Sequence, residues 1–197
     1  MGFFYGAGDD FEQAIRLNPA SVESWNSSAL AYYKTEQHFD ALNNAKTAIK
    51  LDPKFPQAQN TLGLVKYQMG YFKEAMEHFD TALTLNPDYA EAYQNRGLAK
   101  SDMGIVYTAL DDFAKAIELK PDFYEAYNNR GKLWYRTGSL YGALLDFDKA
   151  LEIYPENHKA LFNRGVVNLK LGNKEKGRAD IRKAKELKEK QDALKLE

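Results

Sequence analysis

The sequence predicts an all-α fold built from stacked helix pairs, and regular spacings of three residue types carry this prediction. Alanine, proline and glycine each recur at intervals of 34 residues along most of the chain. The alanines are Ala14, Ala48, Ala82, Ala116, Ala150 and Ala184, and the prolines are Pro19, Pro53, Pro87, Pro121 and Pro155. A period of this length is typical of helix–turn–helix units that bury their apolar faces by stacking on their neighbours. We therefore expect an α-solenoid of about five and a half repeats.

The repeat also sets the expected domain organisation, which is one domain over residues 1–197. When each unit is numbered so that its proline is position 32, the complete repeats are 22–55, 56–89, 90–123, 124–157 and 158–191. Residues 1–21 form a partial repeat that supplies a second helix only, so the array looks truncated. Residues 185–197 form a charged helical extension that we expect to cap and solvate the last repeat.

Each repeat should hold one helix over positions 1–14 and a second over positions 15–28. Position 15 carries Gly70, Gly104, Gly138 and Gly172, and glycine leaves a helix at least conformational cost. The prolines close the units because proline lacks the amide hydrogen that a helix interior needs. Position 8 also carries glycine, and we expect it to face the alanine at position 20 where the two helices touch. These pairs of positions hold Gly63, Gly97, Gly131 and Gly165 opposite Ala41, Ala75, Ala109 and Ala143.

This pattern resembles the tetratricopeptide repeat (TPR) family over residues 2–191. Repeat 56–89 shows it most fully, through Leu62, Gly63, Ala75, Phe79, Ala82 and Pro87. The resemblance implies a right-handed superhelix of antiparallel helix pairs that acts as a protein-interaction scaffold. Four residues depart from the family pattern: Glu36 and Ala45 in the first complete repeat, and Gly177 and Glu189 in the last.

The resemblance implies that the first helices line a concave groove, and amide side chains are frequent at the positions concerned. An amide can pair with a peptide backbone whatever the side chains of that peptide are. We expect a peptide-binding groove in which the asparagines hold backbone and the tyrosines contact side chains. Its candidate residues are Asn26, Asn60, Asn95, Asn128, Asn129, Asn163, Tyr33, Tyr67, Tyr135, Lys132 and Arg136.

Two other interpretations of this stripe stay open. In one, the asparagines only solvate the concave face and the tyrosines pack against adjoining repeats. In the other, basic residues grip a terminal carboxylate, as some relatives do, through Lys132, Arg136, Lys159 and Lys170. Acidic residues share the stripe and weaken that second interpretation; they are Glu23, Glu91, Asp102 and Glu125.

Arginine at position 7 and aspartate at position 23 occur together in the same three repeats. The pairs are Arg96 with Asp112, Arg130 with Asp146, and Arg164 with Asp180. We expect structural ion pairs within a repeat or with the adjoining one, and no acid–base chemistry.

Composition disfavours several other functions. The chain has no cysteine and a net charge of -1, so we expect no thiolate chemistry and no attraction to nucleic acid or an anionic membrane. The histidines fall at unrelated positions and no phosphate loop is present, so we predict no enzyme, cofactor or metal site. Without a signal peptide or membrane span, a cytoplasmic location is expected. The rival to a peptide-binding scaffold is a self-assembly module, a homo-oligomer formed through the apolar N-terminal edge at Phe3, Phe4, Phe11 and Ile15.

Overall fold

The computed structural model describes residue 11 and residues 13–194, and every regular element in that part of the chain is a helix. The first helices of the complete repeats have 13 residues each. They are α2 (Val22–Lys34), α4 (Pro56–Gln68), α6 (Ala90–Asp102), α8 (Tyr124–Arg136) and α10 (His158–Lys170). The second helices have 14 residues, except for the last, which has 20. They are α3 (His38–Leu51), α5 (Phe72–Leu85), α7 (Val106–Leu119), α9 (Leu140–Ile153) and α11 (Lys174–Ala193).

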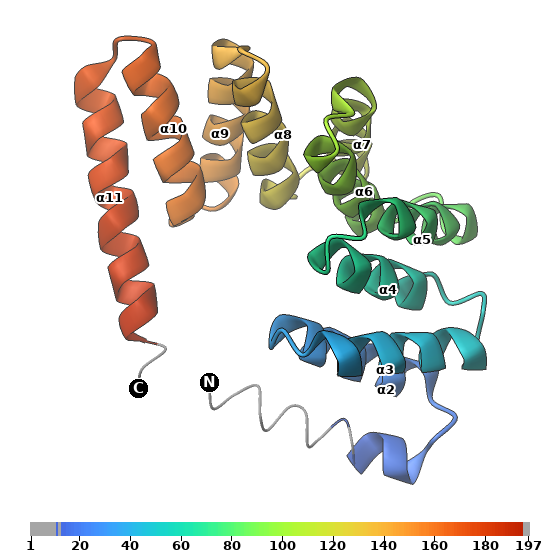
Figure 1. The fold of residues 1–197 in the computed structure, drawn as a ribbon. Coiled ribbons are helices and arrows are strands. Elements are labelled where there is room, and N and C mark those ends of the chain that lie inside the picture. Colours follow the sequence, from blue (N-terminus) through green and yellow to red (C-terminus); the bar gives the residue numbers. More distant parts are fainter. Residues whose placement is uncertain (1–10, 12, 195–197) are drawn as a thin grey trace. The chain divides into compact units, whose positions relative to one another are not determined.

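The chain divides into two compact units, Met1–Ile105 and Val106–Glu197, with the boundary inside the repeat 90–123. In the first unit α2 packs on α3 and α4 on α5, and each second helix also contacts the next first helix. In the second unit α8 packs on α9 and α10 on α11, with the same contacts between successive repeats. The antiparallel arrangement of a repeat is plain in the orange and red α10–α11 hairpin (Figure 1). The single domain over residues 1–197 stays a prediction.

The turns between paired helices follow the glycine pattern. Gly70 and Gly138 have φ angles of 83° and 88°, in the left-handed region that glycine reaches without a Cβ clash. Glu36 occupies the equivalent place in the first complete repeat with φ 61° and is the one non-glycine residue of the described chain with a positive φ. A left-handed conformation costs an ordinary residue about 1–2 kcal/mol. The backbone of the turn is therefore kept even where the glycine is lost.

The glycine at position 8 lies close to more than the residue at position 20 that we expected it to face. A Cβ added at Gly63 would lie 2.5 Å from Cε1 of Phe79, and one at Gly131 would lie 2.8 Å from Cε1 of Phe147. The small residue at position 8 thus makes room for the large side chain at position 24, a contact that we did not predict. Phe79 and Phe147 are fully buried as a result.

In the last repeat the two helix backbones themselves come close. A Cβ on Gly165 would lie 2.9 Å from the carbonyl oxygen of Gly177, and the reverse substitution would meet the Gly165 oxygen at 2.8 Å. This explains why glycine replaces alanine at position 20 of that repeat.

The two ends of the chain are described only in part. Residues 13–17 are helical, where the second helix of the partial repeat is expected. Phe3 and Phe4, which dominate the expected open edge, lie outside the described residues. At the other end α11 continues to Ala193, because Glu189 replaces the proline that stops the earlier second helices.

Candidate functional site

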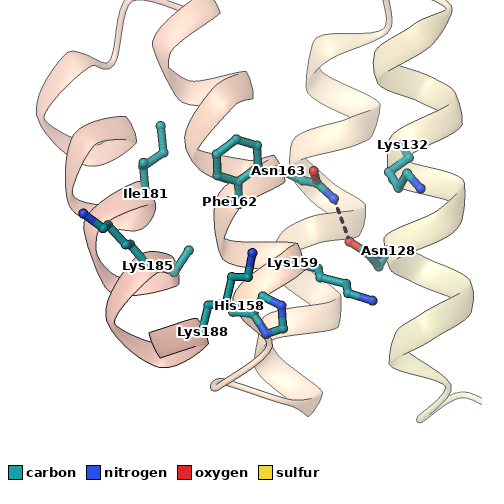
Figure 2. Close-up of a pocket in the computed structure, with 10 residues that line it drawn as sticks. Asn128, Lys132, His158, Lys159, Phe162, Asn163, Ile181, Lys185 and Lys188 are labelled. Carbon is teal, nitrogen blue, oxygen red and sulfur yellow. Dashed lines mark hydrogen bonds between the residues drawn. The ribbon is translucent and has the colours of Figure 1, made fainter. Parts of the chain in front are cut away.

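The asparagines of the predicted groove pair with one another across neighbouring repeats. Asn95 Nδ2 donates to Asn60 Oδ1 at 2.9 Å in the first unit, and Asn163 Nδ2 donates to Asn128 Oδ1 at 3.2 Å in the second. Figure 2 shows the second of these bonds. In both pairs an asparagine at position 5 meets one at position 6 of the next repeat, 35 residues further along the chain. These bonds fix the register of adjacent first helices.

Burial limits what several of these amides can offer a ligand. Asn60, Asn95 and Asn128 are each less than a tenth exposed. Asn26 is also buried, and its Oδ1 has no hydrogen-bond partner among the described residues. By contrast, Asn129 and Asn163 keep intermediate exposure, so they are the amides of the second unit that a peptide can reach.

The predicted tyrosines also contact the following repeat, again over 35 residues. Tyr67 donates its hydroxyl hydrogen to Asp102 Oδ2 at 2.6 Å, and burial together with this carboxylate raises the pKa of Tyr67. In the second unit Lys170 Nζ lies 4.6 Å from the centre of the Tyr135 ring, a cation–π contact. Tyr33 is partly buried, and burial raises its pKa. All three tyrosines are half-buried and contribute to packing as well as to the surface.

Two of the expected ion pairs are bidentate bridges inside a repeat. Arg130 Nε and a terminal nitrogen donate to the two carboxylate oxygens of Asp146 at 2.9 and 2.7 Å. Hydrogen bonding to Asp146 raises the pKa of Arg130 against the opposing effect of burial. Arg164 makes the same bridge to Asp180, at 2.8 and 2.7 Å.

The third arginine at position 7 bridges to the preceding repeat. Arg96 donates to Asp80 at 2.6 Å, and Arg164 adds an equivalent bond to Asp148 at 2.8 Å. Arg96 belongs to the first unit and Asp112 to the second, so their pairing stays a prediction. These arginines connect helices, and none of them lines the groove described next.

A groove of about 650 Å³ opens in the second unit between α8, α10 and α11 (Figure 2). Its floor is apolar, with Phe162, Ile181 and Ala184, and Asn128 and Asn163 lie beside them. Basic side chains come from all three helices: Lys132 from α8, His158 and Lys159 from α10, and Lys185 and Lys188 from α11. Tyr135 and Arg136, at the far end of α8, lie outside this lining.

Part of this groove was not predicted from the sequence. The sequence predicts Asn128, Lys132 and Asn163 in a peptide-binding site and offers Lys159 for a carboxylate clamp. It places Lys185 and Lys188 in a solvating cap, because alternating lysine and glutamate on a terminal helix usually means solvation. One sequence feature could have identified Lys185 as a groove residue, namely its departure from the repeat pattern. It stands at position 28, where the other complete repeats carry Ile49, Leu83, Ile117 and Leu151.

Two further features, a cluster of metal ligands and a membrane-spanning helix, are absent from the part of the chain that the structure describes. Within residue 11 and residues 13–194, no three histidine, aspartate or glutamate side chains gather as metal ligands would. Over the same residues, none of the helices combines the length and the apolar character needed to cross a bilayer.

Solved structures with similar folds are TPR proteins. YrrB, described as "a TPR protein with an unusual peptide-binding site", is 25% identical with a TM-score of 0.63, and the match covers 92% of this chain and 93% of YrrB. MamA is 28% identical with a TM-score of 0.64, covering 80% of this chain and 92% of MamA. TTC0263, a thermophilic TPR protein of Thermus thermophilus, is 25% identical with a TM-score of 0.76, covering 85% of this chain and 92% of TTC0263. No protein among those with curated descriptions matches the sequence.

Sequence models of the repeat itself also match. One described as "TPR repeat" matches residues 29–70 and 66–104, and three described as "Tetratricopeptide repeat" match residues 90–123, 124–157 and 146–179. Together these matches extend without a gap from residue 29 to residue 179, and the helix pairs of both units follow the same boundaries. The chain belongs to the tetratricopeptide repeat family.

Proposed function

We propose that this protein binds a peptide segment of a partner protein in the groove between α8, α10 and α11. TPR proteins serve as protein-interaction scaffolds, and the fold of this chain supports that general role. The observation that carries the finer proposal is the groove itself, which has an apolar floor, one reachable amide at Asn163 and a volume of about 650 Å³. A concave surface that combines apolar area with a few polar groups is what ligand sites generally offer.

The groove is also held in shape before any ligand arrives. The bond between Asn128 and Asn163 sets the spacing of α8 and α10, and the Arg164–Asp180 bridge fixes α10 against α11. A surface organised in this way loses little entropy when it binds, so more of the contact energy becomes affinity. The paired asparagines thus support recognition by positioning the helices, while Asn163, which lines the groove and keeps intermediate exposure, can also offer its amide to peptide backbone.

Phe162 offers the sharpest test, because its side chain is 50% exposed on the groove floor. Peptides would first be selected from a random display library with the full chain, and their affinity would then be measured by isothermal titration calorimetry. Phe162→Ala should weaken binding of the selected peptides about tenfold, as expected for an aromatic residue at the centre of an interface. Its effect on stability should be small, because half of the side chain is already in water.

Phe39 provides a matched control, since it is a phenylalanine of the second helix α3, 75% exposed and outside the groove. Phe39→Ala should leave the affinity for the same peptides unchanged. A library that yields no binding peptide, or equal affinity of the wild type and the Phe162→Ala variant, would refute the proposal.

A further inference from the structure

The groove in the second unit carries an unusual excess of one charge. Lys132, Lys159, Lys185 and Lys188 all lie on its lining, and no aspartate or glutamate does. This contrasts with the whole sequence, in which 27 lysines and arginines are balanced by 28 acidic residues. Figure 2 shows these lysines around the floor formed by Phe162 and Ile181. The positive charge is therefore local and placed at a cavity.

These lysines are also available to a ligand. Among the residues that the structure describes, Lys132, Lys159 and Lys188 form no ion pair, and Lys185 has only an exposed contact of 3.8 Å with Glu189 on its own helix. Two lysines elsewhere in the second unit are engaged, since Lys115 and Lys149 each bind a glutamate one helical turn away, at 2.7 and 2.8 Å. Unpaired like charges around one cavity repel one another, and an anion placed between them removes that cost.

Comparison of the repeats shows that the basic residues break the pattern of the array. Lys132 stands at position 9, where the other complete repeats have Leu30, Leu64, Leu98 and Val166. Lys159 stands at position 2, where they have Glu23, Gln57, Glu91 and Glu125. Lys185 replaces an isoleucine or leucine at position 28. At three positions a lysine thus replaces a neutral or acidic residue, and all three lysines line the same groove. Packing of the repeat requires none of these replacements.

The floor of the same groove also breaks the repeat pattern, because it carries an apolar residue where the other repeats carry amides. Phe162 stands at position 5, where the other complete repeats carry Asn26, Asn60, Gln94 and Asn128. It remains half exposed, whereas most of the equivalent amides are buried. An exposed aromatic residue within a ring of lysines suits a ligand that is acidic and also presents an apolar side chain.

On the basis of the proposed peptide-binding function, we propose that this groove recognises an internal acidic segment of a partner protein. The carboxylates of aspartate and glutamate side chains on that segment bind Lys132, Lys159, Lys185 and Lys188, and a bulky apolar side chain between them packs on Phe162 and Ile181. Recognition does not require a chain terminus, because the lysines lie on both sides of the apolar floor on three different helices. A further helix packed here through apolar contacts would instead bury the charges of Lys132, Lys159 and Lys188 without a partner, at high cost.

The small extent of the basic surface and the apolar floor of the groove disfavour nucleic acid as its ligand. Binding to a phosphate backbone needs an extended basic surface that follows many phosphates. Here four lysines line one groove of a chain with net charge -1. The apolar floor adds specificity for a side chain.

The test uses the full chain and a defined probe in fluorescence anisotropy. The probe is a peptide of eight glutamates around a central phenylalanine, labelled with fluorescein at its N-terminus and amidated at its C-terminus so that no terminal carboxylate is present. It should bind, and a threefold rise in salt from about 0.1 M should weaken binding several-fold, because screening reduces the attraction between charges. A peptide with glutamine in place of every glutamate should bind at least tenfold more weakly.

Two double variants test the two sides of the groove separately. Lys132→Gln with Lys159→Gln removes the charges from α8 and α10, and Lys185→Gln with Lys188→Gln removes those from α11. Each should weaken binding of the acidic probe about tenfold. All four side chains are exposed, so folding should not suffer, and circular dichroism verifies this. The matched control is Lys174→Gln with Lys176→Gln, which removes the same charge from exposed positions of α11 outside the groove and should leave affinity unchanged.

The outcomes separate this inference from the function on which it rests. Unchanged affinity in either groove variant would overturn the inference, and so would tighter binding of the glutamine peptide or of a single-stranded oligonucleotide than of the acidic probe. If in that case library-selected peptides still bind and lose affinity in Phe162→Ala, peptide binding stands and only the acidic specificity fails. If neither the probe nor any library peptide binds, both proposals fail together.

Discussion

In both units, the residue at position 23 connects the two helices of a repeat. It does so through neutral hydrogen bonds in the first unit and through ion pairs in the second. In the first unit position 23 is neutral: Asn44 Nδ2 donates to Ser28 Oγ at 2.9 Å, and His78 Nδ1 lies 3.0 Å from Gln59 Oε1. In the second unit position 23 is always aspartate, and two of these residues, Asp146 and Asp180, are each bridged by an arginine of the preceding helix. The backbone repeat is the same in both. The comparison shows that the scaffold depends on small and apolar residues, which leaves its polar positions free to vary.

The charge of side chains at the groove positions also differs between the two units. The contact over 35 residues joins Tyr67 to an aspartate in the first unit and Tyr135 to a lysine in the second. At position 2 the first unit carries Glu23, Gln57 and Glu91, whereas the second carries both Glu125 and Lys159. The tyrosine contact thus keeps one geometry with a negative partner in one unit and a positive partner in the other. A repeat protein can set the charge of its binding surface in this manner without altering its fold.

Removing the aspartate of a bridge should have the largest effect on stability. Asp146 is 5% exposed and pairs with both nitrogens of the Arg130 fork. Asp146→Ala leaves a largely buried guanidinium without its partner, so the free energy of unfolding should fall by about 3 kcal/mol. Urea denaturation followed by circular dichroism measures this change.

Asn44→Ala is the matched change in the first unit. It removes one neutral hydrogen bond to Ser28, and its cost should be about 1 kcal/mol. Equal losses in the two variants would contradict the view that the units differ in how they connect their helices. The peptides selected by the Asp146→Ala variant should match those of the wild type, because Asp146 lies outside the groove.

The turn of the first complete repeat offers a gain in stability of intermediate size. Glu36 adopts φ 61°, while the equivalent Gly70 of the next repeat has φ 83°. Glu36→Gly should raise the free energy of unfolding by about 1 kcal/mol, because glycine adopts the left-handed region without the Cβ clash. Thermal unfolding of both proteins checks the sign. The reverse change, Gly70→Glu, should lower the melting temperature; a rise would show that the turn conformation is not what the glycine pattern preserves.

Most of the fold could be predicted from the sequence, because the repeat positions of glycine and proline mark the turns between helices. The predicted start of the second helices is wrong, since each begins at position 17, as at His38, and the residue at position 15 belongs to the turn. The sequence also indicated which arginines and aspartates occur together, since both types appear in the same repeats. The amide pairs could not be foreseen, because the bond from Asn60 to Asn95 depends on the register of two helices from different repeats. The lysine groove was missed for a related reason: Lys132, Lys159 and Lys185 occupy three unrelated positions, and only the packing of three helices brings them together.

The smallest expected effect concerns the pH dependence of the first unit. Burial lowers the pKa of His78, and the nearby Lys66 lowers it further. The unfolded chain therefore takes up a proton near pH 6.5, while the folded chain takes it up only at lower pH. As the pH falls below about 6.5, the unfolded state binds more protons and the free energy of unfolding decreases; above that pH both forms are neutral and this contribution is constant.

His78→Asn isolates that contribution, because asparagine is the residue found at the same position in the preceding repeat. The other two histidines, His38 and His158, are common to both proteins, so their effects cancel in the difference. The stability of the wild type relative to the variant, measured by urea denaturation from about pH 8 to about pH 5, should be constant above about pH 6.5 and decline below it. Since His78 is only half-buried, the decline should be modest. A difference that increased as the pH fell would mean that the folded state favours the charged imidazole, and the first unit would then resemble the second in depending on charge at position 23.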